Sequence, residues 1–206
     1  MERLIVYVDG FNLYHGMHDW AGCRKLWLDL VALARSLRAH SQLISVRYFT
    51  APVLDQPAAL SRQTTYLDAL RAHSGDLLTI TQGRYQRKDI LCRSCGHVRP
   101  HYEEKETDVN IAVRIVEDAA KGASDSVLVI SADSDLIPAI TTAKRLNPAL
   151  FIAAAFPPGR YSAHLQRLMP ASFHIGKSKI NNAQLPSVVS DPTTGRTFRR
   201  PAKWHP

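Results

Sequence analysis

The sequence predicts an α/β protein with a mainly parallel sheet that is covered by helices on both faces. Two observations carry this prediction. Apolar, β-branched segments alternate along the chain with segments of helical periodicity, which is the order expected when crossover helices join parallel strands. Two of the strand segments, SVLVISA (126–132) and ALFIAAAF (149–156), are apolar at almost every position, as is typical of strands buried on both faces.

Each predicted element follows from its local pattern. Arg3–Val8 is a short apolar run that ends at the turn sequence DGFN, so it is predicted as the first strand. Thr107–Gly122 is predicted as a helix because Thr107 suits the N-cap, apolar residues recur every three or four positions, and glycine follows the end. The same periodicities predict strands over 43–51, 77–86, 126–132 and 149–156, and helices over 28–40, 59–73, 136–146 and 161–169.

The chain has 206 residues, enough for one domain with its own core and without disulfides. We expect that domain to span residues 1–176, with a cysteine-containing loop over 84–105. Residues 177–206 lack helical or strand periodicity, which predicts an extended or mobile basic C-terminal extension. Of the net charge of +8, +7 comes from residues 160–206, where eight Lys and Arg face one Asp. Such an excess of positive charge either attracts a polyanion or belongs to a tail that is simply solvated.

Composition argues against two classes of protein. No run approaches the roughly 18 apolar residues that cross a bilayer, and the first ten residues resemble a strand rather than a secretion signal. Three cysteines, two of them in one C-x-x-C motif, do not make the disulfide framework of a small secreted domain. We therefore expect a cytoplasmic protein with no membrane partner.

Four aspartates are predicted to meet at one end of the sheet. Asp9 directly follows the first strand, and Asp133 and Asp135 follow the strand SVLVIS. Asp108 lies in the first turn of its helix. In an open parallel sheet, ligands collect at the carboxyl ends of the strands. Turns and helix caps also favour each aspartate singly, so the prediction of a site depends on all four together.

Clustered carboxylates repel one another unless a cation neutralises them. Oxygen ligands suit a hard ion such as Mg²⁺ or Mn²⁺, which leaves room for substrate phosphates. The pattern therefore predicts metal-assisted hydrolysis of phosphodiesters. Asn12, three residues after Asp9, either binds water, metal or phosphate through its amide or serves as a helix N-cap.

Three segments of the sequence resemble the signature blocks of a known family. They are VYVDGFNLYHG (6–16), EEKETDVNIAV (103–113) and VLVISADSDLIPAI (127–140). In order, spacing and strand context they resemble the NYN domain, of the PIN-like ribonuclease superfamily. The segment 181–204 further resembles the C-terminal extension of the bacterial LabA-like branch, so the likeness covers nearly the whole chain.

The resemblance implies a Rossmann-like (PIN-like) α/β/α sandwich and a ribonuclease that cleaves RNA with Mg²⁺ or Mn²⁺. By position it assigns catalytic roles to Asp9, Asn12, Asp108, Asp133 and Asp135. The expected metal ligands are Asp9, Asp108 and Asp133, while Asp135 either is a fourth ligand, positions a water, or only caps the helix. The alternative function is an RNA- or protein-binding module that keeps the acidic residues but catalyses no reaction.

A C-x-x-C motif, Cys92 and Cys95, is followed by His97 and His101. Two cysteines and two histidines are ligands of the kind that a structural Zn²⁺ site needs. Zinc modules usually place the second pair of ligands farther along the chain, which counts against it. A reduced loop without metal and a redox-active pair are the alternatives, and the sequence leaves all three open.

The predicted RNA contacts combine cations with an aromatic residue. Four of them lie at the end of the third predicted strand and just beyond it, and two lie near the acidic residues: Arg84, Tyr85, Arg87 and Lys88, then Lys105 and Ser134. Such a mixture can follow a phosphate backbone and stack on a base, or form an ordinary solvated loop. A homodimer is compatible with these features because a groove built by one small domain is short.

Overall fold

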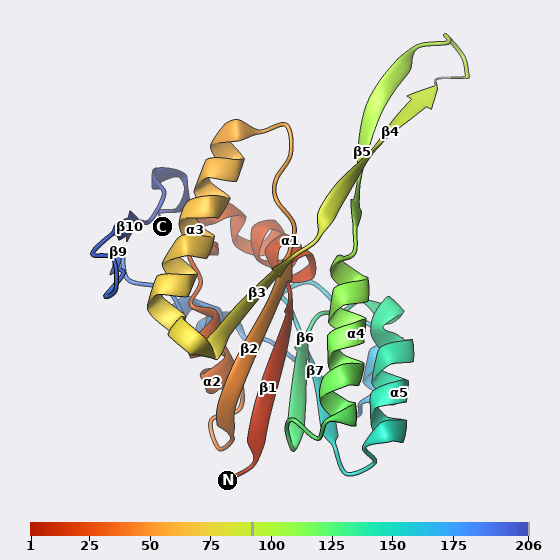
Figure 1. Cartoon of the computed structure of the whole chain (residues 1–206), viewed down its shortest axis with the longest axis vertical. Helices are drawn as coiled ribbons and strands as arrows, with labels where there is room; N and C mark the ends of the chain where they lie inside the picture. Colours follow the sequence, from red (N-terminus) through yellow and green to blue (C-terminus); the bar gives the residue numbers. More distant parts are fainter. Residues whose placement is uncertain (92, 206) are drawn as a thin grey trace.

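The structure is a computed structural model that describes residues 1–91 and 93–205, with the side chains of all but Pro100, His101, Glu103 and Glu104 (Figure 1). The first half contains β1 (Arg3–Asp9), α1 (Gly10–Ala21), α2 (Leu30–Leu37), β2 (Gln42–Thr50), α3 (Pro57–Ser74), β3 (Leu78–Gln82), β4 (Arg84–Leu91) and β5 (Val98–Lys105). The second contains α4 (Thr107–Ala120), β6 (Ser126–Ile130), α5 (Ile137–Leu146), β7 (Phe151–Phe156), α6 (Ala163–Leu168), β8 (Phe173–His174), α7 (Lys177–Asn182), β9 (Val188–Ser190) and β10 (Thr197–Arg199). Four short 3₁₀ helices complete the described chain: η1 (Gly22–Lys25), η2 (Gly75–Leu77), η3 (Ser134–Leu136) and η4 (Ala202–Trp204). In these ranges no helix combines the length and the apolar character that crossing a membrane requires.

The predicted α/β fold with a parallel sheet is confirmed. Six strands lie in the order β3-β2-β1-β6-β7-β8, and each pairs in parallel with its neighbours. Chain order reverses beside β1, since β2 lies on one side of it and β6 on the other. The carboxyl ends of β1 and β6 are therefore adjacent, and ligands bind at such a switch point in doubly wound sheets.

Two hydrophobic cores form because side chains alternate between the two faces of the sheet. One row across the sheet consists of the register partners Leu78, Val46, Val6, Leu128 and Ala153, all of which belong to the core beneath α1, α2 and α3. The opposite face carries the core that includes residues of α4, α5 and α6. The result is an α/β/α sandwich, with α4 and α5 on the far side of the sheet from α2 and α3 (Figure 1).

The segment 84–105, predicted as a loop, is an antiparallel hairpin of β4 and β5. The predicted third strand, 77–86, was therefore wrong at its end, because β3 stops at Gln82. The Gly83 N–H donates to the Thr50 carbonyl at 2.8 Å and so marks where the chain leaves the sheet. Figure 1 shows the hairpin extending away from the body, and the side chains of β4 are mostly exposed.

The C-terminal extension, predicted to be extended or mobile, instead packs on the domain. It forms α7, the β9–β10 hairpin and η4, and the side chains of Val189, Phe198 and Trp204 join the core beneath α3. The Trp27 indole N–H donates to the Pro186 carbonyl at 2.7 Å. Single apolar residues spaced between prolines and polar residues are enough to anchor a segment that has no periodicity of its own.

A buried polar group fixes β1, β2 and α4 to one another. Tyr7 donates its hydroxyl hydrogen to Asp118 across the core, and Arg47 approaches the same carboxylate at 2.9 Å. Burial is the main cause that raises the pKa of Tyr7 well above its usual value, so the phenol stays a donor. Tyr7 and Arg47 together hydrogen-bond and neutralise the Asp118 carboxylate, as a buried charge requires.

Candidate metal centre

Asp9 is held at the junction of β1 and α1. It is the last residue of β1 and the N-cap of α1, where its Oδ1 accepts the Asn12 N–H at 3.0 Å. Gly10 allows this turn to lie against β2, because a Cβ there would stand 2.5 Å from the Phe49 carbonyl oxygen. The close approach sets the position of Asp9 at the switch point of the sheet.

Asp9 is 3% exposed, and its carboxylate accepts the Ser131 hydroxyl hydrogen at 2.7 Å. Burial raises its pKa above the ordinary aspartate value, and the nearby charge of Asp133 raises it further. The hydrogen bonds from the Asn12 N–H and from Ser131 oppose this rise. A nearby cation would stabilise the ionised form of this buried carboxylate, because its charge would offset both the cost of burial and the repulsion from Asp133.

Asp133 is positioned by the loop that follows β6. Its N–H donates to the Ser131 hydroxyl oxygen at 3.0 Å, and its own Oδ1 accepts the Asp135 N–H at 2.9 Å. One residue earlier, the Ala132 N–H donates to the Asn12 amide oxygen at 3.0 Å. Asn12 and Ser131 thus tie the end of β1 to the loop that carries Asp133.

Asp108 completes the group from the first turn of α4. One ligand oxygen from each of Asp9, Asp108 and Asp133 lies within 4.8 Å of the other two, the arrangement that a shared metal ion needs. In the part of the chain that the structure describes, no other His, Cys, Asp or Glu forms such a group. The same three side chains line a cavity of about 210 Å³. Three carboxylates from three segments fit a hard cation such as Mg²⁺ or Mn²⁺.

Comparison with known proteins agrees with this geometry. The sequence profile of the NYN domain matches residues 3–174. The chain belongs to the NYN domain family. This family is part of the PIN-like nuclease superfamily.

Two individual proteins are similar to this NYN domain. The 6-hydroxy-3-succinoylpyridine 3-monooxygenase HspA of Pseudomonas putida is 26% identical over an alignment 225 positions long, which covers 91% of this chain and 71% of the relative. A crystal structure of a protein of unknown function from Vibrio parahaemolyticus superposes with a TM-score of 0.57 at 17% identity, over 85% of this chain and 94% of that one. At that identity the second likeness bears on the fold alone.

Asp135, the fourth predicted acidic residue, stands apart from the three. It is exposed, it belongs to η3, and it supplies a backbone N–H to Asp133. The capping carboxylate of this turn is therefore Asp133 rather than Asp135. Ser134, one of the predicted RNA contacts, is likewise exposed and does not line the acidic cavity.

His15 and Arg160, which were not predicted from the sequence, also line the acidic cavity of the NYN domain. Arg160 follows β7 and forms an ion pair with Asp19 of α1 at 2.5 Å. Helix α1 lies against this segment because position 16 is glycine: a Cβ there would be 2.8 Å from the Pro157 side chain. Arg160 was predictable in the same way as Asp133, because it is a polar residue soon after a buried strand in the segment ALFIAAAFPPGR.

The predicted RNA contacts on the hairpin do not lie around the acidic cavity. Arg84 pairs with Glu106, and Arg87 pairs with Asp89 at 3.2 Å. Lys88 and Lys105 lie on β4 and β5, outside the lining of the cavity. Tyr85 does line a second cavity, beside α1. Contact of these residues with RNA stays a prediction.

The predicted zinc ligands lie only partly within the described residues. Cys92 and the side chain of His101 are outside them. Cys95 is a free, exposed thiol, and His97 is exposed near the turn of the hairpin. A structural Zn²⁺ site therefore stays a prediction.

Proposed function

We propose that this NYN domain is a metal-dependent ribonuclease that hydrolyses RNA phosphodiester bonds at the acidic cavity. The observation that carries the proposal is the approach of Asp9, Asp108 and Asp133 to within 4.8 Å at the carboxyl end of a parallel sheet. Membership of a nuclease superfamily supports it. On the sequence features described above, we also propose that the protein belongs to the LabA-like branch of the family and that it is cytoplasmic.

In this mechanism the three carboxylates hold Mg²⁺ or Mn²⁺. When bound, such an ion would supply activation of the attacking water and stabilisation of the charge that develops on the phosphate oxygens. The Asn12 amide oxygen is already occupied by the Ala132 N–H, so the amide nitrogen is the group of this side chain that donates to substrate. Arg160 brings a positive charge to the same cavity, where it attracts the phosphate.

Cleavage of labelled RNA in Mg²⁺, Mn²⁺ or EDTA tests the proposal. Asp9→Asn, Asp108→Asn and Asp133→Asn are expected to abolish cleavage, and EDTA is expected to do the same. Asp135→Asn is the matched control, because it changes an exposed carboxylate of the same loop that lies outside the group of three. Cleavage that persists in EDTA or in Asp9→Asn contradicts the metal mechanism. RNA binding that weakens with salt, without cleavage, identifies the catalytically silent module instead.

Oxygenation of a small heteroaromatic compound is a second candidate function. The Pseudomonas relative is named for such an activity, and the observation that favours it here is a second cavity with aromatic walls beside α1. Consumption of O₂ and a reduced nicotinamide in the presence of a hydroxypyridine would support it. Absence of that consumption, together with RNA cleavage, favours the nuclease.

A further inference from the structure

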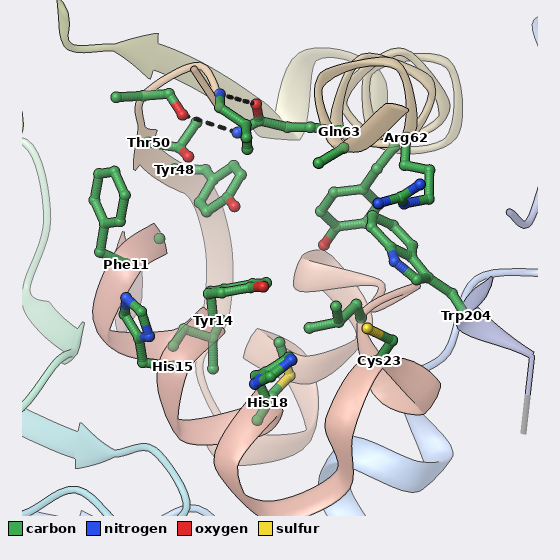
Figure 2. A pocket seen from close by; sticks show the side chains of 18 of the residues that line it. Phe11, Tyr14, His15, His18, Cys23, Tyr48, Thr50, Arg62, Gln63 and Trp204 are labelled. Atoms are coloured by element: carbon green, nitrogen blue, oxygen red, sulfur yellow. Dashed lines mark hydrogen bonds between the residues drawn. The ribbon is translucent and has the colours of Figure 1, made fainter. Parts of the chain in front are cut away.

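A second cavity of about 450 Å³ adjoins the acidic one. It lies between α1, the end of β2, α3 and η4 (Figure 2). Phe11 and His15 line both cavities, so a single ligand can extend from one to the other past this edge of α1. The volume falls in the range of about 300–1,000 Å³ that is typical of small-molecule sites.

Aromatic rings form the walls of this second cavity. The Tyr66 hydroxyl donates to the Leu28 carbonyl at 2.8 Å, and its ring meets the Trp204 ring edge-on with centroids 5.8 Å apart. Tyr48 is buried in the wall, and burial raises its pKa to about 12, with the charge of Asp9 contributing. Tyr14 is 42% exposed and stacks on His18 with centroids 5.5 Å apart. The buried rings are thus fixed before any ligand arrives, which lowers the entropy cost of binding.

The charged groups of this cavity have one sign. Arg62 and Lys203 line it, and no Asp or Glu does so among the described residues. Arg62 is half-buried and makes no hydrogen bond or ion pair within residues 1–91 and 93–205. Its positive charge lies close enough to Tyr14 to lower the pKa of that phenol, against the stronger effect of burial. An anion is the natural partner of such a guanidinium.

Gln63 has a different role, because both ends of its amide are occupied. Its Oε1 accepts the Val53 N–H at 2.8 Å, and its Nε2 donates to the Ala51 carbonyl at 2.9 Å (Figure 2). It therefore fixes the loop that closes the cavity, with each end of its amide engaged by the backbone. Binding in this cavity rests on ring stacking and on positive charge.

We propose that this second cavity is the base-binding subsite of the nuclease, which holds the base of a nucleotide next to the scissile phosphate while that phosphate lies at the three carboxylates. This inference rests on the proposed function. The planar rings suit a base, and the adjacent cations suit the phosphate of that nucleotide. The edge shared with the candidate metal site suits the next phosphate of the same strand. Stacking on aromatic side chains tolerates every base, so the subsite selects for a single strand more than for a sequence.

Calorimetric titration of the full chain with nucleoside 5′-monophosphates in EDTA tests the subsite without requiring catalysis. Ala59 lines the cavity from α3 and is half-buried, whereas its neighbour Ala58 is exposed and does not line it. Ala59→Phe fills the cavity and is expected to weaken binding by about tenfold or more, the loss of one stacked base. Ala58→Phe is the control and is expected to leave binding unchanged. Arg62→Gln is expected to weaken binding of the monophosphate but not of the uncharged nucleoside.

The outcomes separate this subsite from the proposed hydrolysis. Binding that is lost in Ala59→Phe and kept in Asp9→Asn supports the subsite, whether or not the protein cleaves RNA. No saturable binding of any nucleotide, or equal affinity in Ala59→Phe, overturns it. Binding of a small aromatic acid such as nicotinate, with none of the nucleotides, also overturns it and assigns the cavity to a free heteroaromatic anion. An unchanged melting temperature of Ala59→Phe and of Ala58→Phe shows that each variant retains the fold.

Discussion

Ser131 and Asp9 are 122 residues apart in sequence and joined by a buried hydrogen bond of 2.7 Å between the serine hydroxyl and the carboxylate. The same hydroxyl oxygen accepts the N–H of Asp133 at 3.0 Å. One side chain therefore orients two of the three carboxylates. The relationship makes Ser131 a positioning residue for the candidate metal centre.

Ser131→Ala is expected to weaken Mn²⁺ binding. The substitution removes a hydrogen bond that favours the ionised form of Asp9, and it frees the backbone of Asp133. A charge-assisted hydrogen bond contributes about 1.5–3 kcal/mol, so the Mn²⁺ dissociation constant, measured by calorimetry, should rise at least about tenfold. Ser134→Ala is the control because Ser134 is exposed on the same loop. An unchanged affinity in Ser131→Ala would contradict this role.

Asp9→Asn is expected to stabilise the metal-free protein at neutral pH. The pKa of Asp9 is raised in the folded state, mainly by burial, so between the unfolded value of about 3.9 and the folded value the native state binds more protons than the unfolded state. The contribution of Asp9 to stability is therefore fully present below about pH 3.9 and is lost as pH rises through the folded pKa.

Urea unfolding of wild type and Asp9→Asn in EDTA, as a function of pH, measures this effect. The difference in unfolding free energy should grow in favour of the variant as pH rises from about 4 and then level off. Adding Mn²⁺ at neutral pH should raise the melting temperature of the wild type and not of the variant. A pH-independent difference would show that burial of Asp9 carries no charge penalty.

Asp118→Ala is expected to be strongly destabilising. Asp118 and Arg47 pair at 2.9 Å with side chains 5% and 16% exposed, and Tyr7 donates to the same carboxylate. Removing one partner leaves a nearly buried guanidinium without its counter-charge, which costs about 3–5 kcal/mol in unfolding free energy. Denaturant unfolding measures the loss. Asp125→Ala, which breaks the exposed pair with Arg3, is the control and should have little effect.

Neutralising the hairpin cations Arg87 and Lys88 is expected to weaken RNA binding without changing the fold. The β4–β5 hairpin extends from the body and its β4 side chains are mostly exposed (Figure 1), so Arg87→Gln with Lys88→Gln disturbs no core. If each cation contacts one phosphate, the slope of log affinity against log salt for single-stranded RNA falls by about 0.7 per residue. Binding titrations at several salt concentrations test this, with Arg71→Gln on α3 as control. An unchanged slope would remove the hairpin from the RNA path.

The sequence predicted the sheet and the three carboxylates because both depend on local rules. Alternating apolar segments define parallel strands, and an aspartate directly after a strand lies at its carboxyl end, as Asp9 and Asp133 do. The pairing of Tyr7 with Asp118, or of Ser131 with Asp9, is not readable in this way, since each partner is more than 100 residues distant. The separate position of Asp135 depends on which carboxylate of the pair caps η3, and spacing alone does not decide that.

The second cavity was not predictable for a related reason: its walls come from segments that looked unrelated. Tyr14 lies within the first family signature block, 6–16, and Trp204 lies in a tail without periodicity. Only the packing of the tail onto Trp27 and Tyr66, with ring centroids 6.3 and 5.8 Å from Trp204, brings the two sides together. A segment with few apolar residues gives no local signal of where each of them is buried.

Trp204→Ala is therefore expected to affect both stability and ligand binding. Trp204 is 8% exposed and packs on two aromatic rings, so its truncation costs about 3–5 kcal/mol in unfolding free energy, as large-to-small core changes do. The same change removes one wall of the second cavity and should weaken nucleotide binding. Phe198→Ala is the matched control, because Phe198 is equally buried in the extension but does not line the cavity. Below the melting temperature of both variants, Phe198→Ala should keep nucleotide affinity and Trp204→Ala should lose it; equal losses would mean that the extension acts only through overall stability.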